Sequence, residues 1–472
     1  MEAIPIDGGP ARAYIAYRPL AGLAFVGNRA MLDLASTAAR GDIIPDAHAD
    51  ALQFLRSIGF LDDDPPSPPP MTGLFRPTTA VLLLTNQCQL RCTYCYASAG
   101  ELPRRDLSAE LGFAAIDYVS AVARRQGQQQ FEVAFHGGGE PVVAWNVMQA
   151  CTAHARRKRL PARVTLTSNG IWTHGQCSWI VDSLDAVSLS LDGGPETQDR
   201  QRPFVSGRGS STHVMRTVAE LDRHAFPYGI RLTATAPWDD LPRNVRFLCL
   251  ETGCRSMQVE PAFNLTRGGH RQPSESESTA FVEAYLEAFD VAARAGRSLH
   301  YSGARLGRVT SWFCSAPANA LVVNAVGEIV ACYEVTDRTH PLAGISTLGR
   351  IENGRVRLDH AARNRLHALI AARREACRDC FCYWSCAGDC YARAFQPQPN
   401  GHLLRGVRCE ANRSITRQLL LRRIAEGGGV WRAGQRHTGA RPGMPASDAE
   451  AGMGAASEAG TGASVGAGAG AT

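Results

Sequence analysis

Lysine is almost absent from this chain of 472 residues, in which Lys158 is the single lysine among 50 basic residues. The net charge of +6 is therefore carried by arginine. Such a uniform bias indicates the base composition of a genome rather than phosphate recognition. The one basic run, 156–159, falls near the end of a predicted helix, where the helix dipole favours positive charge. We therefore expect no nucleic-acid partner.

Long apolar runs are also missing. A membrane helix needs about 18 consecutive apolar residues, and the best candidate, 320–332, is interrupted by Asn324, Gly327 and Glu328. The first nine residues, MEAIPIDGG, lack the basic and then apolar order of a secretory signal. The sequence predicts a cytoplasmic protein with no membrane partner.

The ends of the chain differ from its middle. Residues 1–62 predict a small unit, 63–76 a stiff proline-rich linker, and 426–472 a disordered tail rich in Gly and Ala. The small unit is expected to contain two strands and then two helices, at 13–17, 23–26, 31–38 and 47–58. A unit of this size is marginally stable alone, so we expect it to dock on its neighbour.

Between residues 77 and 300, apolar runs alternate with amphipathic helical patterns. The runs lie at 80–84, 131–135, 164–167, 186–191, 230–235 and 257–260, and the helical patterns at 109–125, 145–159, 212–224 and 243–252. This alternation predicts an α/β fold with a parallel sheet, a partial (β/α)6 TIM-like barrel. In such barrels the chemistry lies at the carboxyl ends of the strands.

Fifteen cysteines indicate metal binding, because a large chain without an export signal is not a typical disulfide protein. Cys88, Cys92 and Cys95 lie within eight residues, directly after the first apolar run. A four-iron cluster needs one thiolate per iron. Three local thiolates therefore leave three alternatives: a zinc site, a cluster completed by a distant cysteine, or a cluster with one open iron.

The spacing of these cysteines, with Tyr94 before the last of them, resembles the radical S-adenosylmethionine (SAM) superfamily. The resemblance implies a [4Fe-4S] cluster whose open iron binds SAM and which cleaves SAM to a 5′-deoxyadenosyl radical. It also implies that Tyr94 lies beside the adenine. An electron donor such as flavodoxin or ferredoxin is the expected partner.

Three later loops support this resemblance, each directly after an apolar run. They are similar to the elements that contact the amino group, the ribose and the carboxylate of SAM in the superfamily. The implied cofactor-binding residues are Gly138, Gly139, Glu140, Pro141, Ser168, Asn169, Ser190, Asp192 and Arg202, with Arg200 as the alternative to Arg202. Any one of these loops alone would also suit an ordinary turn.

Cysteines gather again in the predicted domain 301–425, and their spacing resembles the seven-cysteine SPASM domain. The resemblance implies two auxiliary [4Fe-4S] clusters, one held by Cys377, Cys380, Cys386 and Cys409, the other by Cys314, Cys332 and Cys390. Residues 301–313 contain no cysteine, so we expect an open iron in the latter cluster unless Cys382 closes it. Paired zinc ribbons are the alternative, but they need two Cys-x2-Cys knuckles and only one is present.

The order of elements in residues 1–62 resembles the winged-helix peptide-recognition element of ribosomal-peptide modification systems. Such elements bind a leader peptide as an added strand at a sheet edge. The alternative for this unit is a structural cap on the barrel. The combined resemblance implies an oxidoreductase that modifies a ribosomally made precursor peptide by a cross-link, a thioether or a dehydrogenation.

Two other functions stay open. Sulfatase-maturating enzymes share the barrel and the SPASM domain, but their pattern has an aspartate directly after the cysteine that corresponds to Cys332. Here Tyr333 and Glu334 follow, so Glu334 is the candidate catalytic base. The other alternative is a non-catalytic iron–sulfur or zinc protein.

Overall fold

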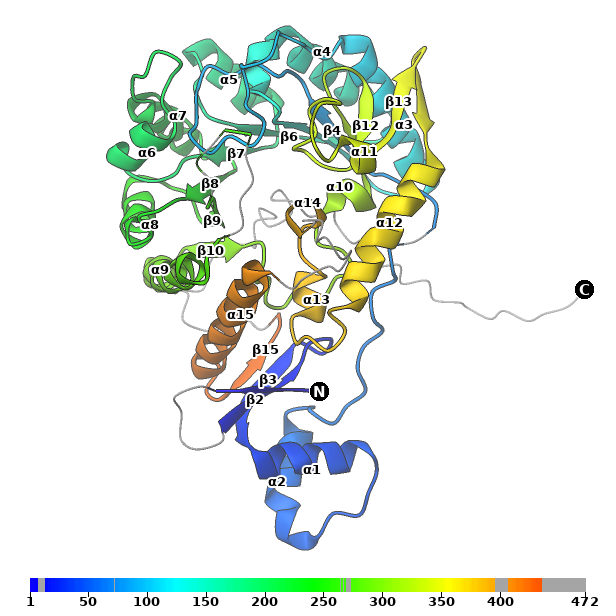
Figure 1. Cartoon of the computed structure of the whole chain (residues 1–472), viewed down its shortest axis with the longest axis vertical. Helices are drawn as coiled ribbons and strands as arrows, with labels where there is room; N and C mark the ends of the chain where they lie inside the picture. The colour runs from blue at the N-terminus through cyan, green and yellow to red at the C-terminus, as the bar shows by residue number, and fades with distance from the viewer. Residues whose placement is uncertain are drawn as a thin grey trace, which may run out of the picture.

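The computed structural model describes residues 1–6, 13–71, 73–263, 265, 267–268, 273–394 and 406–434. Its largest element is an 11-stranded sheet with the order β10-β9-β8-β7-β6-β5-β4-β11-β12-β13-β14. Strands β4 to β10 run parallel to their neighbours and curve into an arc with helices on the outside (Figure 1). This arrangement confirms the predicted α/β barrel class.

The barrel strands are short and mostly buried, as their apolar runs predict. Their bounds are β4 (Thr79–Leu83), β5 (Phe131–His136), β6 (Ala162–Ser168), β7 (Ala186–Ser190), β8 (Tyr228–Ala234), β9 (Ser256–Pro261) and β10 (Ser298–Tyr301). The first six coincide with the predicted runs. The sequence does not reveal β10, because this edge strand has four residues that alternate between exposed and buried.

Helices connect these strands on the convex side of the arc (Figure 1). They are α3 (Ala109–Arg125), α4 (Trp145–Arg156), α5 (His174–Ser183), α6 (Pro195–Gln201), α7 (Ser211–Arg223), α8 (Asp240–Glu251) and α9 (Glu275–Arg294). Side-chain caps fix several starts: Ser108, Thr173 and Ser274 each accept a hydrogen bond from a backbone N–H of the first turn. The predicted helices agree within three residues, and α4 ends at Arg156, inside the basic run.

The cysteine-rich region extends the barrel sheet. Strand β11 (Ala320–Val323) pairs parallel with β4, and β12 (Glu328–Val330), β13 (Thr347–Glu352) and β14 (Arg355–Leu358) follow antiparallel. The helices of this region are α10 (Ser315–Ala318), α11 (Ala343–Ser346), α12 (His360–Glu375), α13 (Tyr383–Cys386), α14 (Tyr391–Ala394) and α15 (Val407–Glu426). This region therefore shares a sheet with the barrel.

The N-terminal unit is a second sheet with the order β1-β2-β3-β15. Its elements are β1 (Glu2–Pro5), β2 (Ala13–Arg18), β3 (Leu23–Asn28), α1 (Arg29–Ala39), α2 (Ala49–Ser57) and the C-terminal β15 (Val430–Arg432). β15 lies in the segment expected to be a disordered tail, and it pairs antiparallel with Leu23, Ala24 and Phe25 of β3. The remainder of that expected tail, 435–472, lies outside the described residues.

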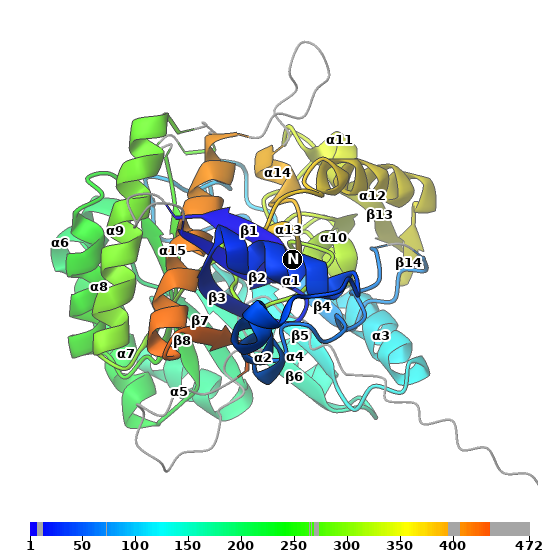
Figure 2. The ribbon, with the colours of Figure 1, turned by 90° about the horizontal axis from the view of Figure 1, so that it is seen from below.

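Both faces of the N-terminal sheet are covered. Phe25 and Leu55 belong to the apolar layer beneath α1 and α2. On the opposite face, Tyr17 and Trp431 pack with Leu420 of α15 and with the loop that carries Cys382. Figure 2 shows this sheet lying over α15 and α13. The unit is thus attached to the cysteine-rich region.

The predicted linker is fastened at both ends. Arg18 donates to Asp64 at 2.7 Å and to the Phe60 carbonyl at 2.7 Å. Arg363 donates to the Gly73 carbonyl at 2.8 Å.

Among the described helices, none combines the length and the apolar character needed to cross a membrane.

Trp431→Ala should loosen the second sheet, because Trp431 is 5 % exposed and fills the layer between the sheet and α15. Truncation of a buried Trp costs about 3–5 kcal/mol. We expect faster hydrogen exchange at the amides of β3, measured by mass spectrometry. Leu250→Ala is the matched control, because Leu250 is 75 % exposed in the barrel. Unchanged exchange in β3 would show that β15 does not stabilise this sheet.

Candidate functional site

The loop that carries Cys88, Cys92 and Cys95 follows β4 and lies against the glycine loop that follows β5. Gly139 N–H donates to the Thr85 carbonyl at 2.7 Å, and Glu140 N–H donates to the Gln87 carbonyl at 2.8 Å. A Cβ at Gly139 would overlap the Gln87 carbonyl oxygen, so this approach requires glycine. The adjacent Gly138 has φ +97, which L side chains rarely adopt.

Two of these sulfurs accept hydrogen bonds from residues that the sequence pattern singled out. Asn169 Nδ2 lies 3.6 Å from Cys88 Sγ, and Arg202 Nη1 lies 3.8 Å from Cys92 Sγ. Burial raises the pKa of Cys88 to about 12 and that of Cys92 to about 11. Thiolates at this position therefore need cationic partners. Three neighbouring thiols, two of them beside hydrogen-bond donors that favour the charged form, fit an iron–sulfur cluster.

Glu140 is 3 % exposed and connects the glycine loop after β5 to the loop after β6. Its two carboxylate oxygens accept from Ser168 Oγ at 2.6 Å and from Asn169 N–H at 2.8 Å. Burial raises the pKa of Glu140 to about 7, although these hydrogen bonds oppose the shift. Pro141 then starts a short 3-10 helix. Glu140 thus fixes the loop that brings Asn169 to Cys88.

Asp192 organises the fourth loop. Its carboxylate accepts from the Tyr94 hydroxyl, from Arg202 Nε at 3.0 Å and from Thr233 N–H at 2.9 Å. The Arg202 guanidinium lies 5.4 Å from the centroid of the Tyr94 ring. The structure therefore brings together three of the predicted site residues, Tyr94, Asp192 and Arg202.

The two other residues predicted for this part of the site are Arg200 and Ser190. Arg200, the alternative to Arg202, points to the exterior and pairs with Asp240 at 3.1 Å. Ser190 ends β7 and is the register partner of Arg231 in β8. Arg202, rather than Arg200, is therefore the arginine beside the first cysteine group.

Cys314, Cys332 and Cys390 form a second group, although they come from distant parts of the chain. Burial raises the pKa of Cys332, and Glu334 and the Cys390 and Cys314 thiols raise it further. Burial also raises the pKa of Cys390 to about 12, with contributions from Glu334 and Cys314. The structure describes all fifteen cysteines and places Cys382 with another group.

This second group of cysteines lies beside the start of the glycine loop that follows β5. The His136 and Tyr333 rings stack with centroids 4.6 Å apart, and Arg231 Nη1 lies 3.5 Å from His136 Nε2. Burial and Arg231 lower the pKa of His136 to about 3, so the imidazole is neutral. No role was predicted for these three residues from the sequence, although His136 directly precedes the glycines and Tyr333 directly follows Cys332.

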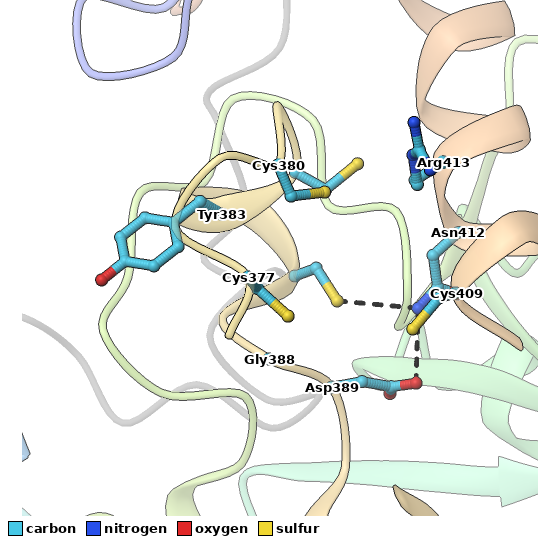
Figure 3. Close-up of a pocket in the computed structure, with 10 residues that line it drawn as sticks. Cys377, Cys380, Tyr383, Gly388, Asp389, Cys409, Asn412 and Arg413 are labelled. Carbon is cyan, nitrogen blue, oxygen red and sulfur yellow. Dashed lines mark hydrogen bonds between the residues drawn. The ribbon is translucent and has the colours of Figure 1, made fainter. Parts of the chain in front are cut away.

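A third group surrounds one cavity near the N-terminal sheet (Figure 3). Its cysteines are Cys377, Cys380, Cys386 and Cys409, together with Cys382. Cys382 is 2 % exposed, and its thiol forms hydrogen bonds with the side chains of Cys380 and Thr416. Cys382 therefore lies on this cavity and not with Cys314, Cys332 and Cys390.

The candidate base Glu334 lies near the second group, 3.9 Å from Arg393. Arg393 is also 3.8 Å from Glu260, at the carboxyl end of β9. No sequence motif pointed to Glu260. Among the described residues, no three His, Cys, Asp or Glu side chains converge on a single metal ion. A cluster binds one thiolate per iron, so its ligands do not converge on one point.

Residues 82–242 match the Radical SAM superfamily. The chain is 24 % identical over 348 residues to the serine-type anaerobic sulfatase-maturating enzyme of Klebsiella aerogenes, a match that covers 70 % of this chain and 82 % of the relative.

Two solved structures share the fold. The structure of anSMEcpe with bound AdoMet has a TM-score of 0.58 at 16 % identity and covers 76 % of this chain and 96 % of its own. Streptococcus suis SuiB bound to the precursor peptide SuiA has a TM-score of 0.52 at 15 % identity and covers 78 % and 82 %.

Glu140→Gln should weaken SAM binding, because the resemblance assigns Glu140 to the amino group of SAM, and an amide accepts a weaker hydrogen bond from an ammonium than a carboxylate does. Loss of a hydrogen bond to a charged group costs about 1.5–3 kcal/mol, which corresponds to roughly a ten- to hundred-fold weaker affinity. The measurement is isothermal titration of the anaerobic protein with SAM. Glu132→Gln is the control, because Glu132 lies on β5, the strand before the Glu140 loop, and pairs with Arg163. Equal affinities for both variants would contradict a role of Glu140 in this loop.

Proposed function

We propose that this chain, a member of the radical SAM superfamily through residues 82–242, modifies a ribosomally made peptide by hydrogen abstraction. The observation that carries the proposal is the stack of His136 on Tyr333, which joins the end of β5 and its glycine loop, packed against the first cysteine loop, to the second cysteine group. This stack lies at the carboxyl end of β5, the end of the barrel at which such folds hold their substrates.

The residues of the first loop would hold a [4Fe-4S] cluster through Cys88, Cys92 and Cys95. When bound, this cluster and SAM supply a 5′-deoxyadenosyl radical. Asn169 and Arg202 donate hydrogen bonds to the ligand sulfurs. Asp192 holds Arg202 and Tyr94 in place, so the adenine would lie against a fixed ring.

The other cysteines would hold two auxiliary clusters. Cys377, Cys380, Cys386 and Cys409 supply four thiols, whereas Cys314, Cys332 and Cys390 supply three. The group of three leaves one iron for a substrate thiolate, which favours a thioether product. Electrons would come from a carrier such as flavodoxin or ferredoxin.

The peptide would bind to the N-terminal sheet as an added strand. SuiB, a fold neighbour, has been solved with its precursor peptide, which supports a peptide partner. In this chain β15 covers Leu23, Ala24 and Phe25, whereas β3 continues to Asn28. Val26, 44 % exposed, is the first residue beyond β15. We assign the docking edge to Val26–Asn28.

A sulfatase-maturating activity is the second candidate, because the Klebsiella relative covers most of this chain. In that case Glu334 would be the base, with Arg393 at 3.9 Å from its carboxylate. Mass spectrometry separates the two candidates when the chain is co-expressed with a candidate precursor peptide or with a sulfatase. A formylglycine in the sulfatase and an unmodified peptide would favour the second candidate.

Replacing Cys88, Cys92 and Cys95 with Ala should abolish formation of 5′-deoxyadenosine with dithionite, because no thiolate remains for the first cluster. Full occupancy of three four-iron clusters is about twelve irons per chain, so the triple variant should retain about eight. Cys151→Ala is the control, since Cys151 packs in the barrel core. Undiminished 5′-deoxyadenosine from the triple variant would refute radical SAM chemistry at this loop.

Val26→Asp should lower the yield of modified peptide in co-expression without lowering SAM cleavage measured without peptide. A carboxylate at this edge disfavours strand addition. This point variant is preferable to deletion of residues 1–62, because deletion would uncover Cys382 and Trp431. Leu250→Asp is the control on an exposed barrel helix. Equal yields from the two variants would favour the structural-cap alternative.

A further inference from the structure

Asn412 joins the barrel to the third cysteine group. It lies on α15 and is 1 % exposed. Its Nδ2 donates to Cys386 Sγ at 3.6 Å, and its Oδ1 accepts from the Tyr301 hydroxyl at 2.8 Å. Tyr301 is the last residue of barrel strand β10. One amide therefore connects a barrel strand to a sulfur of the cavity in Figure 3.

The orientation of this amide is fixed by its surroundings. Asn412 Nδ2 also faces the Asp389 carboxylate at 3.4 Å, and a carboxylate oxygen accepts but does not donate. Arg408 Nε holds the same carboxylate at 2.8 Å. With the nitrogen facing Asp389, the N–H side of the amide must also face Cys386.

Close packing around the Asn412 side chain also fixes its position. A Cβ at Gly303 would overlap Asn412 Oδ1, so the backbone after β10 closes directly over the side chain. The Arg408 guanidinium lies over the ring of Tyr301, the donor to Asn412 Oδ1, at 5.4 Å from the ring centroid. Fixed, buried donors change the electrostatics of a site more than mobile, solvated ones.

We propose that Asn412 is a positioning residue that sets the reduction potential of the auxiliary cluster bound by Cys377, Cys380, Cys386 and Cys409. The inference rests on the proposed function, which supplies that cluster. Hydrogen bonds to ligand sulfurs are one of the factors that set the potential of an iron–sulfur cluster. The added electron increases the negative charge on the sulfurs, so a donated N–H stabilises the reduced form and raises the potential.

The test is a redox titration of the anaerobic full-length chain followed by electron paramagnetic resonance, with iron content measured in parallel. The signal missing from Cys409→Ala identifies the relevant cluster. In Asn412→Ala we expect that cluster alone to become about tenfold harder to reduce, a shift of about 59 mV to more negative potential. Asn412→Asp should shift it further, because it adds negative charge, while about twelve irons are retained.

Two further variants separate tuning from loss of structure. Tyr301→Phe removes the hydroxyl that holds Oδ1 but leaves the amide present, so it should give a smaller shift in the same direction. Asn324→Ala is the matched control, because Asn324 is equally buried but donates to Glu328 rather than to a sulfur. It should shift no potential.

The possible outcomes test the role of Asn412 separately from the presence of the auxiliary clusters. About twelve irons with an unchanged potential in Asn412→Ala and Asn412→Asp would overturn the role of Asn412 alone. Loss of about four irons in Asn412→Ala, with no shift in Tyr301→Phe, would show that Asn412 builds the site instead of tuning it. About four irons in the unsubstituted chain would overturn the auxiliary clusters themselves.

Discussion

The buried ion pair between Arg202 and Asp192 is the interaction on which the first site depends. Both side chains are at most 10 % exposed, and a buried charge without a partner is strongly destabilising. The pair places the Arg202 guanidinium beside Cys92 and the Tyr94 ring. Asp192 also accepts a hydrogen bond from Thr233 N–H, so it holds the loops after β4 and β7 in a fixed position relative to β8. A positive charge is thereby held beside the Cys92 sulfur.

The sequence was sufficient where the information is local. Apolar runs with intervening amphipathic helices predicted β4 to β9, because buried parallel strands read as continuous apolar segments. The loops after those strands predicted Tyr94, Glu140, Asp192 and Arg202 as a set, and the structure brings them to one end of the barrel. Their contacts with a bound cofactor stay predictions.

Contacts between distant segments could not be predicted in this way. β15 has three residues in a glycine-rich context and becomes a strand only because β3 offers its edge. Asn412 is one of several polar residues on α15, and nothing local distinguishes it from the others. The stack of His136 on Tyr333 joins residues almost two hundred positions apart. These contacts depend on how the cysteine-rich region closes over the barrel, which hydrophobic periodicity does not specify.

The N-terminal sheet has a structural role whether or not it binds a peptide. Its inner face supplies Ile15 and Tyr17 to the apolar layer that contains Cys382 and Cys386. A strand added at the edge of β3 would therefore extend the same sheet that shields the third cysteine group from water. Solvent exposure is among the factors that set cluster potentials. Glu260 of β9 lies between Arg393 and Arg408, so it connects α15, on which the sheet packs, to the segment that follows Cys390.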